Sequence, residues 1–464
     1  MRILKDISPI GIFAAAVLMA HGAAAQSVTN MNAMRGLVSV TTLGITGAGK
    51  AALASNFTVT CDIQSGSANE FLLLSFPDQQ QQALRDAFIS GIAYELADGL
   101  GNKLGDAYKA TTSHTSADDC KTSGLISILP AVGRLIAFAN ATSHADSDVA
   151  KYFFANETLD GREPVSVEAM VVLSEVSGTT DVFGKAYKPS GDSSRPDTCG
   201  AKTNPFGNPR PFQTALHLTE YNGKDFCGTE TPNTAYLCGP KQNLVANPAY
   251  PSGHTVYGYM ESLLLALLVP ERYQQMVTRA AEYGNDRIVL GAHSAMDVLA
   301  GRTLAQYDLA QLLADKADYV GVKRGEVEID DFREALAAAR ADLTAAFEHA
   351  CGGKIADCAT QDQSRFADPT KNRAFYEATQ TYGLPVVFAN NAEGTEDVAK
   401  FAPEAGYLLT MAFPILTLAQ ADAILTLTEG PGGGFLDNGS AFGVYSRLDL
   451  YKAAEQAAAL SNRH

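Results

Sequence analysis

The chain contains 464 residues, of which 46% are hydrophobic and 19% are charged, and its formal net charge is −16. A chain of this length and composition forms one large globular domain or two ordinary ones with a sizeable buried core. The acidic charge argues against binding to nucleic acid or to an anionic membrane, since both are themselves negatively charged. A pocket for an anion must therefore draw its positive charge from a few local residues.

Residues 1–25 have the pattern of a secretory signal peptide. Arg2 and Lys5 supply the positive start, Ile10–Ala20 the apolar core, and three alanines before Gln26 a small-residue cleavage site. A membrane anchor is the alternative, but the apolar core is shorter than the ~20 residues that cross a bilayer. We therefore expect a secreted, periplasmic protein with no integral membrane span.

Two segments with different patterns follow the signal. Residues 26–76 are rich in Ser, Thr, Gly and Asn, and we expect them to form a loose lead-in. Between Pro77 and Tyr108, large apolar residues recur at four-residue steps, which predicts a helix. This helix would begin a helical core over residues 77–318, to which two further apolar stretches also belong: Leu125–Phe138 and Val165–Val176.

A long loop comes next. Residues 186–250 are dense in Pro, Gly, Asn, Asp and Cys and show little periodicity. Loops of this length in compact domains are usually functional or disordered. We interpret this one as the wall and lid of an active site, and a surface excursion with no catalytic part is the alternative. It contains two possible pairs of cations: Lys188 with Arg195, and Lys202 with Arg210.

The stretch after this loop carries the polar residue types that phosphate chemistry uses. Arginine offers a planar fork that matches phosphate oxygens, and glycine lets a backbone N–H approach an anion closely. Imidazoles serve as nucleophile or as general acid, and a carboxylate can orient an imidazole. The catalytic block, residues 186–302, is therefore expected to act through Ser252, Gly253, His254, Arg287, His293 and Asp297.

Helices are expected on both sides of these residues. A helix over Asn285–Leu313 would place His293 and Asp297 on one face, because residues four apart are neighbours on a helical surface. Val327–Cys351 is amphipathic and opens a mostly helical C-terminal extension over residues 319–464. The glycine run Gly430–Gly434 lacks the Gly-Lys-Ser/Thr ending of a phosphate loop and predicts a turn. The other expected helices are Thr255–Leu268 and Pro270–Tyr283.

Seven cysteines fit an exported protein with disulfide bonds. Cys227 with Cys238, and Cys351 with Cys358, would each close a short loop. A looser possibility pairs Cys61 with Cys120 and leaves Cys199 over. A metal cluster is the alternative for any set of cysteines, but the chain contains no C-x-x-C pair.

The block resembles the superfamily that joins bacterial acid phosphatases, type-two phosphatidate phosphatases and vanadium haloperoxidases. The family signature reads K-x6-R-P, P-S-G-H and S-R-x5-H-x3-D, and its second part is intact at residues 251–254. The third part has Asp286 in place of serine and keeps its arginine, histidine and aspartate in register. For the first part, Lys188 and Arg195 fit the spacing, whereas Lys202 and Arg210 have one residue too many but precede the usual Pro-Phe.

The resemblance implies an all-α helical bundle with the site between helices, the long loop over it and the C-terminal extension alongside. It implies phosphomonoester hydrolysis through a phosphohistidine on His293, with Asp297 orienting the ring and His254 as acid and base. Ser252, Gly253, Arg287 and one lysine–arginine pair of the long loop would bind the phosphate of a small substrate, without a metal or other cofactor. A weaker resemblance to longer secreted members covers residues 400–455.

Two other functions remain open at this point. The first is a vanadium haloperoxidase, in which His293 would coordinate vanadate as the cofactor; the lack of tryptophan is a mark against it. The second is a secreted protein that binds a phosphorylated ligand without turnover. Asp286, which departs from the family signature, would then reflect the loss of catalytic function. The sequence indicates neither the substrate nor the oligomeric state.

Overall fold

The structure is a computed structural model that describes residues 33–87, 91–114, 125–143, 211 and 249–461. Over these residues the protein is mostly helical, and its strands form two small antiparallel pairs. This confirms the all-α class expected from the sequence. The segment Val165–Val176 and nearly all of the long loop lie outside the described residues.

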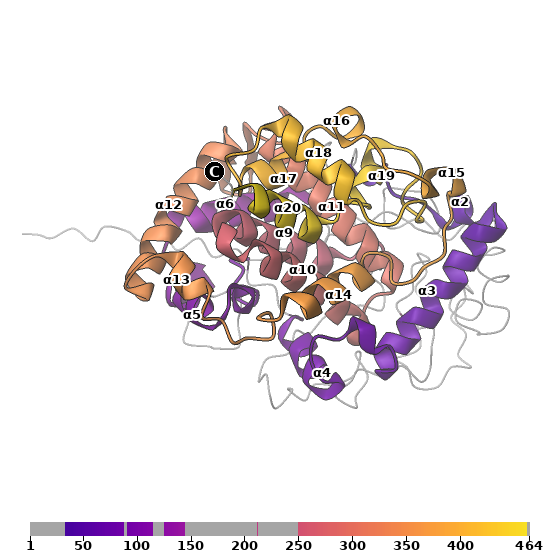
Figure 1. Cartoon of the computed structure of the whole chain (residues 1–464), viewed down its shortest axis with the longest axis horizontal. Coiled ribbons are helices and arrows are strands. Elements are labelled where there is room, and N and C mark those ends of the chain that lie inside the picture. The colour runs from indigo at the N-terminus through magenta and orange to yellow at the C-terminus, as the bar shows by residue number, and fades with distance from the viewer. Residues whose placement is uncertain (1–32, 88–90, 115–124, 144–210, 212–248, 462–464) are drawn as a thin grey trace, which may run out of the picture.

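Three helices occupy the centre of the molecule (Figure 1). The first of them, α9, is mostly apolar, and nearly all of its side chains are buried against its neighbours. Gly258 allows a close approach there, because a Cβ atom at this position would lie 2.2 Å from the ring of Tyr283. The three helices are α9 (Gly253–Leu268), α10 (Tyr273–Val289) and α11 (Ala295–Leu313). A short 3-10 turn, η5 (Pro270–Arg272), lies between α9 and α10.

The expectation of one continuous helix over Asn285–Leu313 is wrong. Helix α10 ends at Val289, and α11 begins only at Ala295. Gly291 lies between them with φ of +74°, a left-handed conformation that stops a helix and that favours glycine. His293 therefore lies in the connection and not on a helix.

The N-terminal region is more ordered than the expected lead-in. Helix α3 alone has 19 residues, and it packs against α10 and α11. Thr46 caps its start by accepting a hydrogen bond from the N–H of Gly49, and Gly66 ends it with φ of +72°. The elements of this region are α2 (Val40–Gly44), α3 (Gly47–Ser65), η1 (Asn69–Phe71) and α4 (Phe76–Arg85).

The helix expected over Pro77–Tyr108 is broken into parts. Gly91 and Ala93 both have positive φ, so the backbone turns although the four-residue apolar spacing continues. Leu125–Ser127 is also a strand and not the start of a helix, because it pairs with Thr112–His114. The elements after α4 are η2 (Ala97–Leu100), α5 (Asn102–Ala110), β1 (Thr112–His114), β2 (Leu125–Ser127) and α6 (Pro130–Ser143).

The amphipathic helix expected before Cys351 is confirmed, although it begins five residues later than expected. Helix α12 (Phe332–Cys351) starts at the cap residue Asp331, whose side chain accepts from the N–H of Glu334. A short hairpin of β3 (Val322–Arg324) and β4 (Val327–Ile329) precedes it. The expected apolar stripe is buried against α5, α6 and α9: Phe332, Leu336, Ala339, Leu343 and Phe347.

The C-terminal extension packs on α10 and α11 through several short helices (Figure 1). The run Gly430–Gly434 lies in the connection between α18 and α19, as expected for a turn. Gly433 has φ of +76°, and its N–H donates to Asp437. The helices are α13 (Ile355–Ala359), α14 (Pro369–Thr379), α15 (Ala389–Ala392), α16 (Val398–Phe401), α17 (Tyr407–Thr410), α18 (Leu418–Thr428), α19 (Ala441–Tyr445) and α20 (Leu450–Ser461).

The structure tests two of the expected disulfides. Cys351 and Cys358 are bonded, so this pairing is confirmed. The looser pairing of Cys61 with Cys120 is wrong, because Cys61 has a free thiol whose pKa is raised by burial and by Asp62. The cysteines at positions 120, 199, 227 and 238 lie outside the described residues. No helix in the described part of the chain is long and apolar enough to cross a membrane.

Candidate active site

Ser252 and Gly253 lie at the N-terminus of α9. Ser252 is the cap residue, and its hydroxyl oxygen accepts hydrogen bonds from the N–H and the hydroxyl of Thr255, at 3.2 and 2.8 Å. With both bonds accepted, the hydroxyl proton of Ser252 is the group that can donate to an anion. The start of a helix also carries partial positive charge and directs N–H groups outward, which suits phosphate.

His293 is fixed in the turn between α10 and α11. Its backbone N–H donates to the carbonyl oxygen of Arg287 at 3.2 Å. Its Nδ1 lies 3.5 Å from Oδ2 of Asp297, and the same oxygen accepts from the N–H of Ser294 at 2.8 Å. The expected contact between histidine and aspartate is therefore present, although a turn and not a helical face produces it. The arrangement directs Nδ1 towards the carboxylate.

One backbone hydrogen bond joins the two parts of the site. The N–H of Ser252 donates to the carbonyl oxygen of Asp297 at 3.0 Å. Gly301 lets α11 approach closely there, because a Cβ atom at this position would lie 2.7 Å from the carbonyl oxygen of Ser252. The cap of α9 is thereby held against the first turn of α11, next to His293.

All the candidate residues that the structure describes are buried. Arg287 is 0% exposed, His293 2% and His254 8%, so charge on any of them acts in a medium where electrostatic interactions are strong. Nε2 of His254 lies 3.3 Å from the carbonyl oxygen of Ala87. The four loop cations lie outside the described residues: Lys188, Arg195, Lys202 and Arg210.

The carboxylate of Asp286, which replaces the serine of the family signature, belongs to a buried polar network. It is 0% exposed and accepts a hydrogen bond from Nε2 of Gln79 at 2.7 Å. Burial raises its pKa well above the ordinary range, and the nearby carboxylates of Asp86 and Glu282 raise it further. A raised pKa extends the pH range over which the uncharged, protonated form is present, and in that form Asp286 would not repel an anion.

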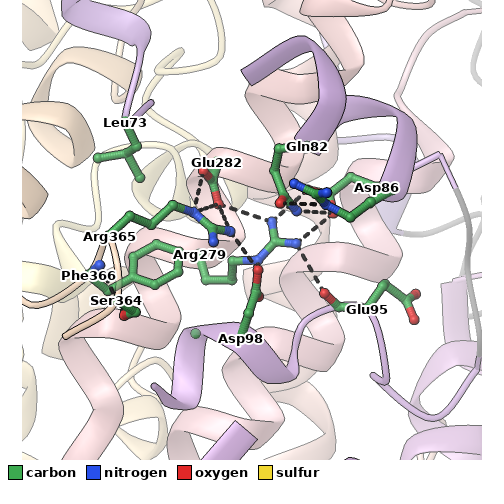
Figure 2. Close-up of polar contacts among 12 residues, drawn as sticks. Leu73, Gln82, Asp86, Glu95, Asp98, Arg279, Glu282, Ser364, Arg365 and Phe366 are labelled. Atoms are coloured by element: carbon green, nitrogen blue, oxygen red, sulfur yellow. Dashed lines mark hydrogen bonds and ion pairs between the residues drawn. The ribbon is translucent and has the colours of Figure 1, made fainter. Parts of the chain in front are cut away.

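Sequence reasoning missed the centre of this network, Arg279. Its guanidinium makes a bidentate ion pair with Asp86, with both distances 2.6 Å, and donates to Asp98 at 2.7 Å (Figure 2). Arg365 of the extension binds Glu282 and the second oxygen of Asp98, each at 2.6 Å. Since these partners are far apart in the chain, no local pattern could have indicated them. The network ties α10 to α4, η2 and the extension.

The Asp286→Asn variant is expected to change how stability depends on pH. A raised pKa in the folded state means that the wild type loses stability as pH rises from about 4 towards that pKa, at up to ~1.4 kcal/mol per pH unit. Asparagine resembles the protonated acid in shape and does not titrate. Urea unfolding between pH 4 and 8 should therefore show a flatter profile for the variant, and an unchanged slope would contradict a raised pKa.

Comparison with known proteins agrees with this geometry. Residues 199–307 match the model of the PAP2 superfamily. The matched region contains Ser252, His254, Arg287, His293 and Asp297.

Several curated relatives share part of their sequence with this chain. The non-specific acid phosphatase of Salmonella typhimurium is 31% identical over 146 residues, which are 28% of this chain and 58% of that protein. A non-specific acid phosphatase of Salmonella typhi is 30% identical over the same length. The acid phosphatase of Zymomonas mobilis is 37% identical over 98 residues, 21% of this chain and 35% of that protein. The chain thus spans little more than half the length of the Salmonella relatives.

Proposed function

We propose that the protein is a phosphoric monoester hydrolase of the acid phosphatase type that acts on exported or periplasmic phosphorylated substrates. The observation that carries the proposal is the contact between His293 and Asp297. The hydrogen bond from the N–H of Ser252 to the carbonyl oxygen of Asp297 holds this pair next to the start of α9. The relatives named acid phosphatase support it.

The proposed reaction has two steps. Because Nδ1 of His293 faces Asp297, Nε2 is the nitrogen that attacks phosphorus; an N–P bond forms and the P–O bond to the leaving group breaks. His254 gives a proton to the leaving oxygen. Water then attacks phosphorus, the N–P bond breaks, and His254 takes the proton of the water. Asp297 stabilises the positive charge on the ring.

The phosphate oxygens would be bound by Arg287, the Ser252 hydroxyl, the N–H of Gly253 and one lysine–arginine pair of the long loop. The family match begins at residue 199, so it contains Lys202 and Arg210 but neither Lys188 nor Arg195. This favours the second pair for the cation site. Fixed cations would supply the charge stabilisation that a metal ion provides in other phosphatases, and the described residues contain no group of three or more side chains suited to hold a metal.

The proposal is tested by hydrolysis of an aryl phosphate in EDTA, with and without vanadate. We expect turnover that EDTA leaves unchanged and that vanadate inhibits, because vanadate resembles the pentacoordinate transition state. Loss of turnover in EDTA would contradict a metal-independent mechanism. Vanadate-dependent oxidation of bromide by peroxide, with no hydrolysis, would point to a haloperoxidase. Binding of phosphate with neither reaction would point to a protein that only binds its ligand.

A further inference from the structure

Three polar side chains on one face of α3 contact the segment that carries His293. Asn56, Thr60 and Gln64 follow one another at four-residue steps, so they form a row along the helix. Figure 1 shows α3 beside the central helices, and it packs on both α10 and α11. The row spans the chain from the last turn of α10 to the first turn of α11.

The first two residues of this row bind the start of α11. The N–H of Met296 donates to Oδ1 of Asn56 at 2.8 Å, and the N–H of Ala295 donates to Oγ1 of Thr60 at 3.2 Å. These N–H groups belong to the first turn of a helix, where no intrahelical acceptor exists. Asn56 is 2% exposed and Thr60 1%, so water cannot easily replace them.

Thr60 also ties this contact back to α3 itself. Its hydroxyl donates to the carbonyl oxygen of Asn56 at 2.6 Å while it accepts from Ala295. The donor and acceptor functions of the hydroxyl are both in use, which fixes its rotamer. The acceptors for α11 are therefore rigidly placed.

Gln64 binds the other end of the segment. Its Nε2 donates to the carbonyl oxygen of Ile288 at 2.8 Å, in the last turn of α10. The same nitrogen lies 2.8 Å from the place where a Cβ atom at Gly291 would be, so the amide covers the turn closely. The turn from Leu290 to Ser294, with His293 in it, is thus held at both ends by one helix.

We propose that Asn56, Thr60 and Gln64 are positioning residues for His293, which hold the turn so that the imidazole can reach phosphorus. The inference rests on the proposed function and adds to it a role for a helix outside the residues of the family match. A displacement of about 1 Å at a reacting group can lower the rate roughly 10²-fold. Loss of one of these bonds should therefore lower kcat more than it raises KM.

The test compares the full chain with its Thr60→Val, Thr60→Ser and Thr58→Val variants in aryl phosphate hydrolysis. Valine keeps the shape of threonine and removes the hydroxyl. We expect Thr60→Val to lower kcat about 10- to 10²-fold with little change in KM, and Thr60→Ser to restore most of the rate. Thr58→Val makes the same change on the exposed face of α3 and should behave as the wild type.

A second pair of variants guards against failure to fold. Asn56→Asp keeps an acceptor oxygen near the positive end of α11, and Asn56→Ala removes it. Activity is measured only under conditions in which far-ultraviolet circular dichroism shows that the variant is folded. If wild type and Thr58→Val are both inactive, the proposed function fails, and this inference with it. If both hydrolyse the ester and the folded Thr60→Val and Asn56→Ala variants keep the wild-type kcat, this inference alone is overturned.

Discussion

Replacing His293 by alanine is expected to remove hydrolysis of an aryl phosphate, with kcat falling on the order of 10⁴-fold or more. The reason is that the proposed nucleophile disappears, and a water molecule in its place cannot form the covalent intermediate. His293 is 2% exposed, and its backbone N–H still binds Arg287 after the substitution, so the turn should keep its course. The measurement is steady-state hydrolysis, together with trapping of a phosphorylated protein by rapid acid quench.

The matched control is His349→Ala. His349 lies on the exposed face of α12, so its loss should leave both the rate and the trapped phosphoprotein unchanged. A His293→Ala protein that is folded and still hydrolyses the ester at the wild-type rate would refute the phosphohistidine mechanism. Equal losses in both variants would indicate a general effect of histidine removal and would also count against it.

The contact between His293 and Asp297 was predicted from the sequence, but the local structure that produces it was not. The four-residue spacing predicted a shared helical face, whereas α11 begins at Ala295. Two local signals indicated the correct answer. Gly291 favours a left-handed turn, and Ser294 with Asp297 three residues later is a signature of a helix start. The expectation of one helix rested on the four-residue spacing alone and did not use these signals.

The role of α3 could not be read from its own residues. Asn56, Thr60 and Gln64 form a polar row on a helix whose other residues are mostly small, and such a row by itself is typical of a solvent-facing surface. Their partners lie more than 220 residues later in the chain. Only the packing of α3 against α10 and α11 shows that the row is buried.

Replacing Arg279 by methionine is expected to destabilise the protein by about 3–5 kcal/mol, the range for breaking a buried ion pair by removing one partner. Arg279 is fully buried, and its loss leaves Asp86, Asp98 and Glu282 with one cation, Arg365, among them. Asp86 should be affected most, because it is fully buried and loses its bidentate partner, whereas Asp98 and Glu282 keep Arg365. The free energy of unfolding in urea at pH 7 provides the measurement.

The matched substitution for this prediction is Arg373→Met, which breaks the surface ion pair between Arg373 and Glu455. Exposed pairs of this kind contribute ~0–1 kcal/mol, so the variant should unfold close to the wild type. The comparison separates the effect on stability of removing an exposed charge from the effect of removing a buried charge. If Arg279→Met is no less stable than Arg373→Met, the expected cost of leaving buried acids without their partner is refuted. Burial without Arg279 should raise the folded-state pKa values of these acids above those in the unfolded chain, so Arg279→Met should gain stability relative to the wild type as the pH falls from 7 to 5, whereas Arg373→Met should not.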